Sequence, residues 1–121
     1  MLVNSLDPQT HAWVLYPDIK TDYSPRTASD ALAEAVSLAY ALPGLRVIGE
    51  SVVRLPRAHP GKLFGKGKIE ELGVLFKEAE VELVLVDGHV SPVQQRNLEK
   101  DWGVKILDRT GLILEIFSNR A

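Results

Sequence analysis

Residues 83–94 read Leu-Val-Leu-Val-Asp-Gly-His-Val-Ser-Pro-Val-Gln, and they decide the fold class. The first four are apolar without alternation, which is typical of a strand covered on both faces, as in a parallel sheet. The last four combine a capping serine, a proline suited to the first helical position and a glutamine that completes a capping box. The segment therefore predicts a buried strand followed by a helix on one face of a parallel sheet.

The same alternation of strand and helix extends in both directions from this segment. Hydrophobic spacing predicts strands at 12–16, 45–55, 83–86 and 104–107, and helices at 27–42, 67–79, 91–102 and from Asp108 or Thr110 to Phe117. Pro17 is expected to close the first strand, Gly49 to mark a bulge in the second, and Pro43-Gly44 to end the first helix. We therefore expect one α/β domain over residues 1–121, a four-stranded, mostly parallel sheet flanked by helices.

Composition narrows the class of protein. The 121 residues are 45% hydrophobic and 25% charged, which excludes a disordered or low-complexity chain. No apolar run approaches the roughly 20 residues of a membrane helix, and the first ten residues lack the features of a secretory signal. Cysteine is absent, so disulfides, thiolate metal sites and a cysteine nucleophile are excluded, which fits a cytoplasmic location.

Charge is nearly balanced overall but unevenly distributed. Fourteen basic and sixteen acidic residues give a net charge of −2. Between Arg46 and Lys68, six basic residues face Glu50 alone, a local charge of +5. Such a segment could steer a polyanion to one edge of the domain, or it could be a solvated loop in which basic residues are scattered.

The glycine- and lysine-rich segment 61–68 is the first candidate for a phosphate site. Its spacing is one residue too short for a P-loop, and Gly67 stands where the magnesium-binding hydroxyl should be. A weaker hypothesis survives, in which an anion meets the free N–H groups at the start of the following helix. Its residues would be Gly65, Lys66, Gly67 and Lys68; alternatively they form only the turn into that helix.

No catalytic or metal site is expected elsewhere. The Asp-x-x-Gly string that starts at Asp108 matches a GTPase motif by coincidence, because no P-loop precedes it, and Asp108 is interpreted as a helix cap. Arg109 is expected at the carboxyl edge of the sheet, where α/β domains bind ligands. The third helix is unusually polar, and Gln94 and Arg96 are suited to contacting RNA, whereas Trp102 is interpreted as a core anchor.

Three strings carry a resemblance to a known family. They are Gly65-Lys66-Gly67-Lys68-Ile69-Glu70-Glu71-Leu72, then Ser91-Pro92-Val93-Gln94-Gln95-Arg96-Asn97-Leu98-Glu99, then Asp108-Arg109-Thr110-Gly111-Leu112-Ile113-Leu114. In this order they resemble the N-terminal domain of the HflX family of ribosome-associated GTPases. The match is strong from about residue 45 to residue 121, although the loop 87–90 departs from the more acidic loop of the family.

The resemblance implies a larger protein in which a helical hairpin and a GTPase domain follow this domain, so that the chain would be a truncated piece of it. GTP and magnesium would belong to that absent GTPase domain, and this piece would hold no cofactor. The implied partners are the large ribosomal subunit, through its rRNA, and the protein's own helical and GTPase domains. The implied RNA-docking residues are Arg54, Arg57, Lys62, Lys66, Lys68, Gln94, Arg96 and Arg109.

Two alternatives to ribosome docking stay open. Family members described as binding ATP through the N-terminal region point to a purine-nucleotide site in the loop 61–68, at Gly65, Lys66, Gly67 and Lys68, and at the sheet edge near Asp87 and Arg109. The other alternative is a regulatory domain that packs on the GTPase domain through apolar surface near Leu112, Ile116 and Phe117.

Overall fold

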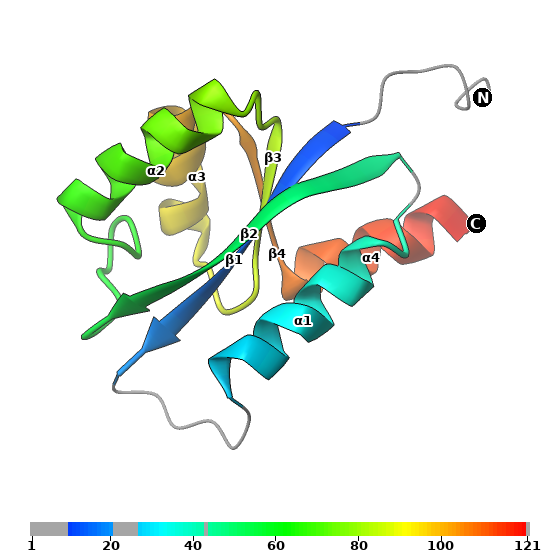
Figure 1. Ribbon diagram of the computed structural model, residues 1–121, viewed down its shortest axis with the longest axis horizontal. Helices are drawn as coiled ribbons and strands as arrows, with labels where there is room; N and C mark the ends of the chain where they lie inside the picture. The colour runs from blue at the N-terminus through cyan, green and yellow to red at the C-terminus, as the bar shows by residue number, and fades with distance from the viewer. Residues whose placement is uncertain (1–9, 21–26, 43, 121) are drawn as a thin grey trace.

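The computed structural model describes residues 10–20, 27–42 and 44–120, with side chains described up to residue 115 (Figure 1). Strands and helices alternate along the chain: β1 (Thr10–Ile19), α1 (Ala28–Ala39), β2 (Leu45–Leu55), α2 (Lys66–Glu78), β3 (Leu83–Val86), α3 (Pro92–Trp102), β4 (Lys105–Asp108) and α4 (Arg109–Arg120). The predicted α/β fold is confirmed.

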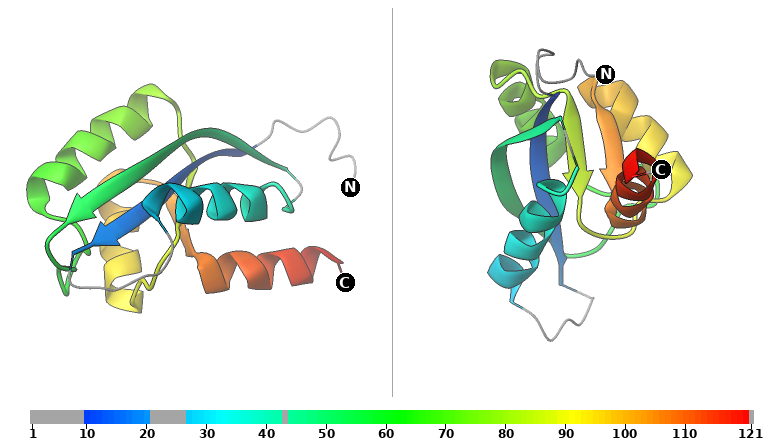
Figure 2. Two further views of the ribbon diagram at one scale, coloured as in Figure 1. Left: turned by 60° about the horizontal axis from the view of Figure 1, so that its bottom comes forward. Right: turned by 90° about the vertical axis from the view of Figure 1, so that its right-hand side faces the viewer.

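The four strands form one sheet in the order β2-β1-β3-β4, and every neighbouring pair is parallel. Helices α1 and α4 cover one face, and α2 and α3 cover the other (Figure 2). The two faces have separate cores. Leu32 of α1 and Leu112 of α4 belong to one, and Phe76 of α2 and Leu98 of α3 belong to the other.

Strand β3 is the most deeply covered, as its uninterrupted apolar sequence predicts. All four of its residues are buried, because β1 and β4 flank it and helices lie on both faces. The helix that follows also begins as predicted. The Ser91 hydroxyl accepts from the Gln94 N–H at 3.1 Å, and the Gln94 side chain accepts from the Ser91 N–H at 2.9 Å, which completes the capping box. Gly103 ends α3 at φ 66°.

Strand β1 is longer than predicted, because Pro17 does not end it. The strand runs to Ile19, and Pro17 lies opposite Val53 of β2. Pairing with β3 stops at Leu15, so the last part of β1 has only one neighbouring strand. A proline is tolerated there because one side of the strand needs no main-chain donor.

The bulge expected near Gly49 is present, and its cause is Trp13. The register between β1 and β2 shifts by one residue, from Ala12 opposite Val47 to Trp13 opposite Gly49. The indole ring of Trp13 lies against Gly49, and a Cβ atom on residue 49 would overlap Cζ3, Cη2 and Cε3 of the ring. Glycine is therefore required by the close approach of the ring.

Helices α1 and α4 differ most from their predicted bounds, each by three residues at its C-terminal end. Helix α1 ends at Ala39, three residues early, and residues 40–42 form a turn before Gly44, whose φ of 87° confirms the expected left-handed glycine. Pro43 lies outside the described residues. Helix α4 begins at Arg109, and the Asp108 carboxylate accepts from the Gly111 N–H at 2.8 Å, so its predicted capping role is confirmed.

Candidate functional site

The loop between β2 and α2 is held in shape by side chains of α3. His59 and Leu63 exchange two main-chain hydrogen bonds of 2.9 Å, which close a tight loop around residues 60–62. Gln94 Nε2 donates to the His59 carbonyl and Asn97 Nδ2 to the Gly61 carbonyl, each at 2.7 Å. These amides are three residues apart and share one face of the helix. The loop therefore has a fixed shape rather than a free solvated one.

Helix α2 begins at Lys66, inside the basic segment between Arg46 and Lys68. Gly65 is its N-cap, and no side chain satisfies the first N–H groups. Lys66 and Gly67 are exposed, and Lys68 Nζ lies 3.2 Å from Glu71 of the same helix. The positive end of the helix dipole and Lys66 thus share one exposed corner of the domain.

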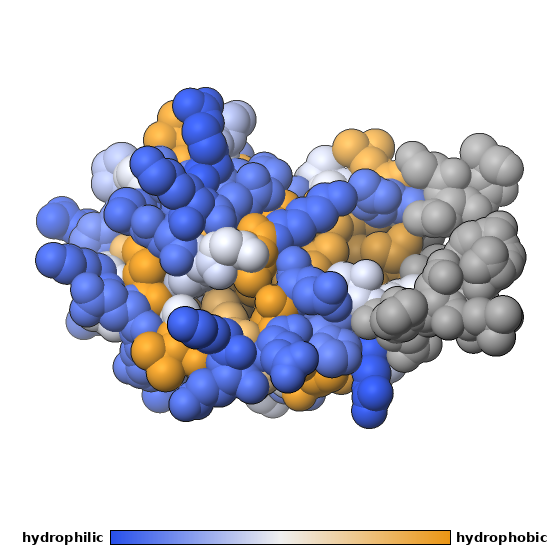
Figure 3. Space-filling model, turned by 90° about the horizontal axis from the view of Figure 1, so that it is seen from above, coloured by the Kyte–Doolittle hydropathy of each residue, from blue (hydrophilic) through white to orange (hydrophobic). Residues whose placement is uncertain are grey.

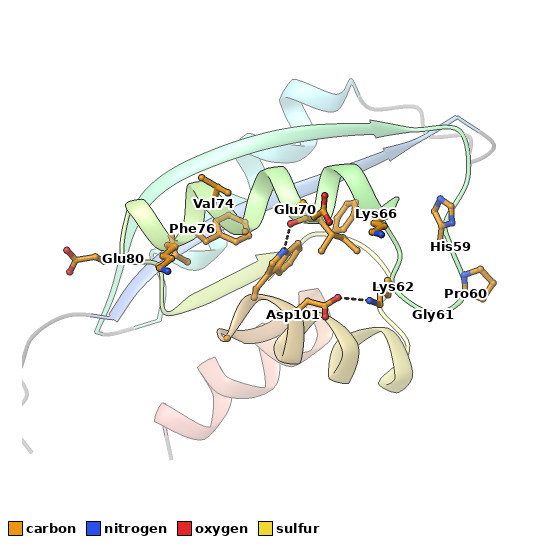
Figure 4. Close-up of a pocket in the computed structure, with 17 residues that line it drawn as sticks. His59, Pro60, Gly61, Lys62, Lys66, Glu70, Val74, Phe76, Glu80 and Asp101 are labelled. Atoms are coloured by element: carbon orange, nitrogen blue, oxygen red, sulfur yellow. Dashed lines mark hydrogen bonds and ion pairs between the residues drawn. The ribbon is translucent and has the colours of Figure 1, made fainter.

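A groove of about 1060 Å³ lies between α2 and α3 (Figure 4). Its apolar lining includes Phe64, Phe76 and Trp102, and the last two rings meet edge to face at 5.0 Å. The Trp102 indole N–H donates to the Ile69 carbonyl at 2.9 Å, so Trp102 is the predicted core anchor. The Lys62 ammonium lies 2.9 Å from Asp101 at one end of the groove.

The surface seen from the α2 side is mostly hydrophilic, with hydrophobic atoms visible between charged side chains (Figure 3). The charges on the rim of the groove are mixed. Its charged lining residues are three basic ones, Lys62, Lys66 and Lys77, and three acidic ones, Glu70, Glu80 and Asp101. The groove itself therefore does not favour a polyanion, and the basic corner lies at one end of it.

A second hollow, of about 670 Å³, lies at the carboxyl ends of the strands. Arg109 lines this hollow, and its guanidinium lies 2.6 Å from Glu34 of α1 and 3.4 Å from the buried Asp87. The hydrogen bond to Glu34 raises the pKa of Arg109 further, aided by the charges of Asp87 and Glu34 and opposed by partial burial. Arg109 therefore remains charged throughout the neutral range.

The structure divides the predicted docking residues into two groups. Arg57, Lys66 and Arg96 are exposed and take part in no ion pair within the described residues, and Arg54 is exposed with a single 3.8 Å contact to Asp18. The others have partners inside the domain. These are Lys62, Lys68, Gln94 and Arg109. Of the predicted docking residues, Arg57, Lys66 and Arg96 therefore present charge that no ion pair of the described residues neutralises.

Three residues of α3 have roles that the sequence analysis missed. Asn97 holds the loop at Gly61, while Gln95 Nε2 donates to the Ile106 carbonyl at 3.1 Å and Glu99 accepts from the Ile106 N–H at 3.0 Å. Gln95 and Glu99 thus satisfy main-chain groups on the outer edge of β4. Contacts to main-chain groups thus largely explain the unusual polarity of α3. In the sequence, the spacing of the amide and carboxylate side chains of this helix was the signal for these contacts.

The described part of the chain contains neither a candidate metal-binding cluster nor a candidate membrane-spanning helix. No group of three or more histidine, aspartate or glutamate residues there could hold a metal ion. None of the helices in the same residue ranges has the length and hydrophobicity that crossing a membrane requires.

Comparison with known proteins identifies the family. Residues 29–118 match the family described as GTP-binding GTPase N-terminal. The GTPase HflX of Magnetococcus marinus is 46% identical over 78 residues, or 64% of this chain and 18% of that protein. The GTPase HflX of Chlamydia pneumoniae is 37% identical over 116 residues, or 95% of this chain and 24% of that protein. The chain belongs to the HflX family.

A solved structure shares the fold of this HflX-family domain. The GTP-binding protein from the archaeon Sulfolobus solfataricus, in complex with GDP, superposes with a TM-score of 0.64 at 16% identity. The match covers 91% of this chain and 30% of that one. The chain thus spans about a fifth to a quarter of the curated relatives named above, and it corresponds to the N-terminal domain of a GTP-binding protein.

Proposed function

We propose that this chain is the RNA-docking domain of an HflX-type GTP-binding protein that acts on the large ribosomal subunit, in ribosome splitting or rescue. The observation that carries the proposal is the set of exposed cations near the carboxyl end of the sheet. Arg57 lies in the loop after β2, Lys66 begins α2, and Arg96 lies in the second turn of α3. Three elements thus bring unneutralised charge to one end of the domain.

The loop that α3 holds gives these cations a defined arrangement. Phosphate groups attract such side chains mainly through charge, and binding releases counterions from the RNA. A fixed arrangement of cations also costs less side-chain and main-chain entropy on binding than a mobile loop does. Affinity for the large subunit should therefore fall steeply as salt increases.

The experiment is a triple charge reversal with a matched control. Arg57, Lys66 and Arg96 are each replaced by Glu, which changes the net charge without breaking an ion pair of the described residues. The control reverses three exposed cations near the opposite end of the sheet, which are Arg46, Lys77 and Lys100. Co-sedimentation of each chain with purified large subunits is measured at several salt concentrations.

The triple variant should bind about a hundredfold more weakly, and the dependence of log K on log salt should lose roughly three units of slope. The control should keep the slope of the unmodified chain within about one unit. Equal losses in the two variants would point to a nonspecific effect of net charge and contradict the proposal. Unchanged binding of the triple variant would exclude this corner as the dock.

A second candidate function is a purine-nucleotide site at Gly65, Lys66, Gly67 and Lys68. The uncapped start of α2 favours it, because this exposed corner adjoins a groove with an apolar lining. Calorimetry of the chain with ATP and with GTP tests this alternative. Heat that disappears in the Lys66→Ala variant would support it, and no heat at millimolar nucleotide would exclude it.

A longer protein would carry the remaining functions. We infer that GTP and magnesium bind in a separate GTPase domain, and that the helical and GTPase domains pack against α4. Leu112 is buried within this domain, whereas Ile113 and Leu114 are 39% and 62% exposed, so the last two are the apolar contacts that α4 offers here. The side chains of Ile116 and Phe117 lie outside the described residues. Deleting residues 1–121 from the longer protein should then change GTP turnover without ribosomes.

A further inference from the structure

The two edges of the sheet differ in how their main-chain groups are satisfied. At the β4 edge, Gln95 and Glu99 bind the carbonyl and the N–H of Ile106. At the other edge, β2 runs over eleven residues, Leu45–Leu55, and β1 is its only neighbour. Figure 2 shows β2 as the outermost strand, with α1 and α2 on the two faces beside it. An open edge of this length is a template for another strand.

The residues that face outward on β2 follow from the register. Lys20 N–H donates to the Leu55 carbonyl at 2.9 Å, so Leu55 directs its carbonyl to β1. Main-chain groups alternate between the two sides of a strand, and Glu50, Val52 and Arg54 therefore direct theirs away from β1. Within the described part of the chain, no hydrogen bond joins these outward groups to another segment.

Helix α1 extends this open edge with an uncharged surface. Glu34 marks the flank of α1 that faces α4, because it binds Arg109 at 2.6 Å. Ser29, Ala33 and Tyr40 lie on the opposite flank, toward β2, and all three are exposed, with Tyr40 at 65%. The small side chains of Ser29 and Ala33 allow a second helix to approach closely, and Tyr40 adds exposed aromatic surface at the end of this flank.

We propose that this surface binds a second copy of the same chain, with the two β2 strands antiparallel about Val52. In this register Glu50 lies opposite Arg54 of the partner copy, and the twofold axis repeats the pair. Pairing about Glu50 or about Arg54 would place like charges opposite each other. The register about Val52 alone joins all three outward residues that follow the bulge, Glu50, Val52 and Arg54, and also matches their charges.

The helices permit this arrangement. Each α1 packs over β1 and β2, so a continuous sheet across the twofold axis would bring the two α1 helices side by side. Neighbouring strands lie about 4.8 Å apart, and each α1 lies over the middle of its β1–β2 pair. The two helix axes would therefore be about two strand spacings apart, or about 10 Å, which is at the upper end of ordinary helix packing. The flanks that meet would be those with Ser29, Ala33 and Tyr40.

Sedimentation of the 121-residue chain over a range of concentrations tests the proposal, with circular dichroism as a check of folding. The unmodified chain should form a dimer, and Arg54→Glu should weaken it about tenfold, because two attractive pairs become repulsive. Arg46→Glu is the matched control, since it makes the same charge change on the same strand outside the paired register, and it should leave dimerisation unchanged. The exchange Glu50→Arg with Arg54→Glu should restore dimerisation.

Val52→Pro gives a second readout. It removes an outward N–H that β1 does not use, so the folded monomer should persist while the dimer is lost. A chain that remains monomeric at the highest concentration would overturn the proposal. So would a dimer in which the charge exchange fails to restore what Arg54→Glu removes, because the interface would then lie elsewhere.

Discussion

Replacing Gly49 by alanine should be among the most destabilising single-methyl additions in this domain. The new Cβ atom would overlap three atoms of the Trp13 ring, so the ring must move. That movement disturbs two contacts of the indole, which donates to the Ser51 hydroxyl at 3.1 Å and packs 6.0 Å from the Phe76 ring. Overpacking costs about 1–3 kcal/mol and a lost hydrogen bond about 1 kcal/mol, so we expect a loss of about 3 kcal/mol.

Urea unfolding followed by tryptophan fluorescence and by circular dichroism measures this loss. For a domain of this size, about 3 kcal/mol corresponds to a midpoint roughly 2 M lower in urea. Gly67→Ala is the matched control, because a Cβ there meets nothing within 4 Å and alanine favours the first turn of α2. It should stabilise the domain by a few tenths to about 1 kcal/mol.

A double variant separates the steric cause from a general preference for glycine. In a chain that carries Trp13→Leu, the overlap is gone, and Gly49→Ala should then cost less than about 1 kcal/mol. If alanine at this position cost the same with and without the indole, the close approach of Trp13 would not be the reason for the glycine. A midpoint equal to that of the unmodified chain would refute the reasoning entirely.

Three further substitutions test the side-chain contacts of the domain by urea unfolding. Arg109→Met leaves the buried Asp87 beside an apolar group and should cost about 1–2 kcal/mol after discounting for the partial exposure of Arg109. The hydrogen bond to Glu34 raises the pKa of Arg109, so its charge is retained from pH 7 to pH 10 and the loss should be constant over that range. A change of the loss within that range would contradict the assignment. Glu99→Ala leaves the Ile106 N–H without its acceptor and should cost about 1–2 kcal/mol, whereas Glu99→Gln retains an acceptor and should cost less than half as much. Ser91→Ala removes the cap of α3 and should cost about 1 kcal/mol, with Ser91→Asp close to neutral.

The elements were predictable because their signals are local. The apolar run Leu83–Val86 indicated a covered strand, and the spacing of Ser91, Pro92 and Gln94 indicated a capped helix. The bulge was also visible as a glycine within a β-branched run, although the sequence did not reveal that Trp13, 36 residues earlier, is what requires it. Family membership followed from long motifs in the correct order, and the comparisons confirm it.

The candidate site was less predictable because its contacts join distant segments. Gln94 has the chemistry of an RNA-contacting side chain, yet its amide donates to the carbonyl of His59, 35 residues away. Lys62 contributes to the basic segment in the sequence, but Asp101 neutralises it in the fold. The packing of α3 against the loop therefore decides which cations remain available to a partner. Counting charges along the sequence cannot distinguish the available cations from the neutralised ones.

The position of Arg109 has a mechanical consequence. As the first residue of α4, it ties that helix at one end both to α1, through Glu34, and to the carboxyl end of β3, through Asp87. The helix then extends to Arg120 with Leu114 turned toward solvent. Buried Leu112 and the 3.8 Å contact between Glu115 and Lys105 of β4 hold the helix further along, so α4 and the sheet are linked at several points. A displacement of α4 would thus reach the carboxyl edge of the sheet by two routes, the ion pairs of Arg109 and the core packing of Leu112.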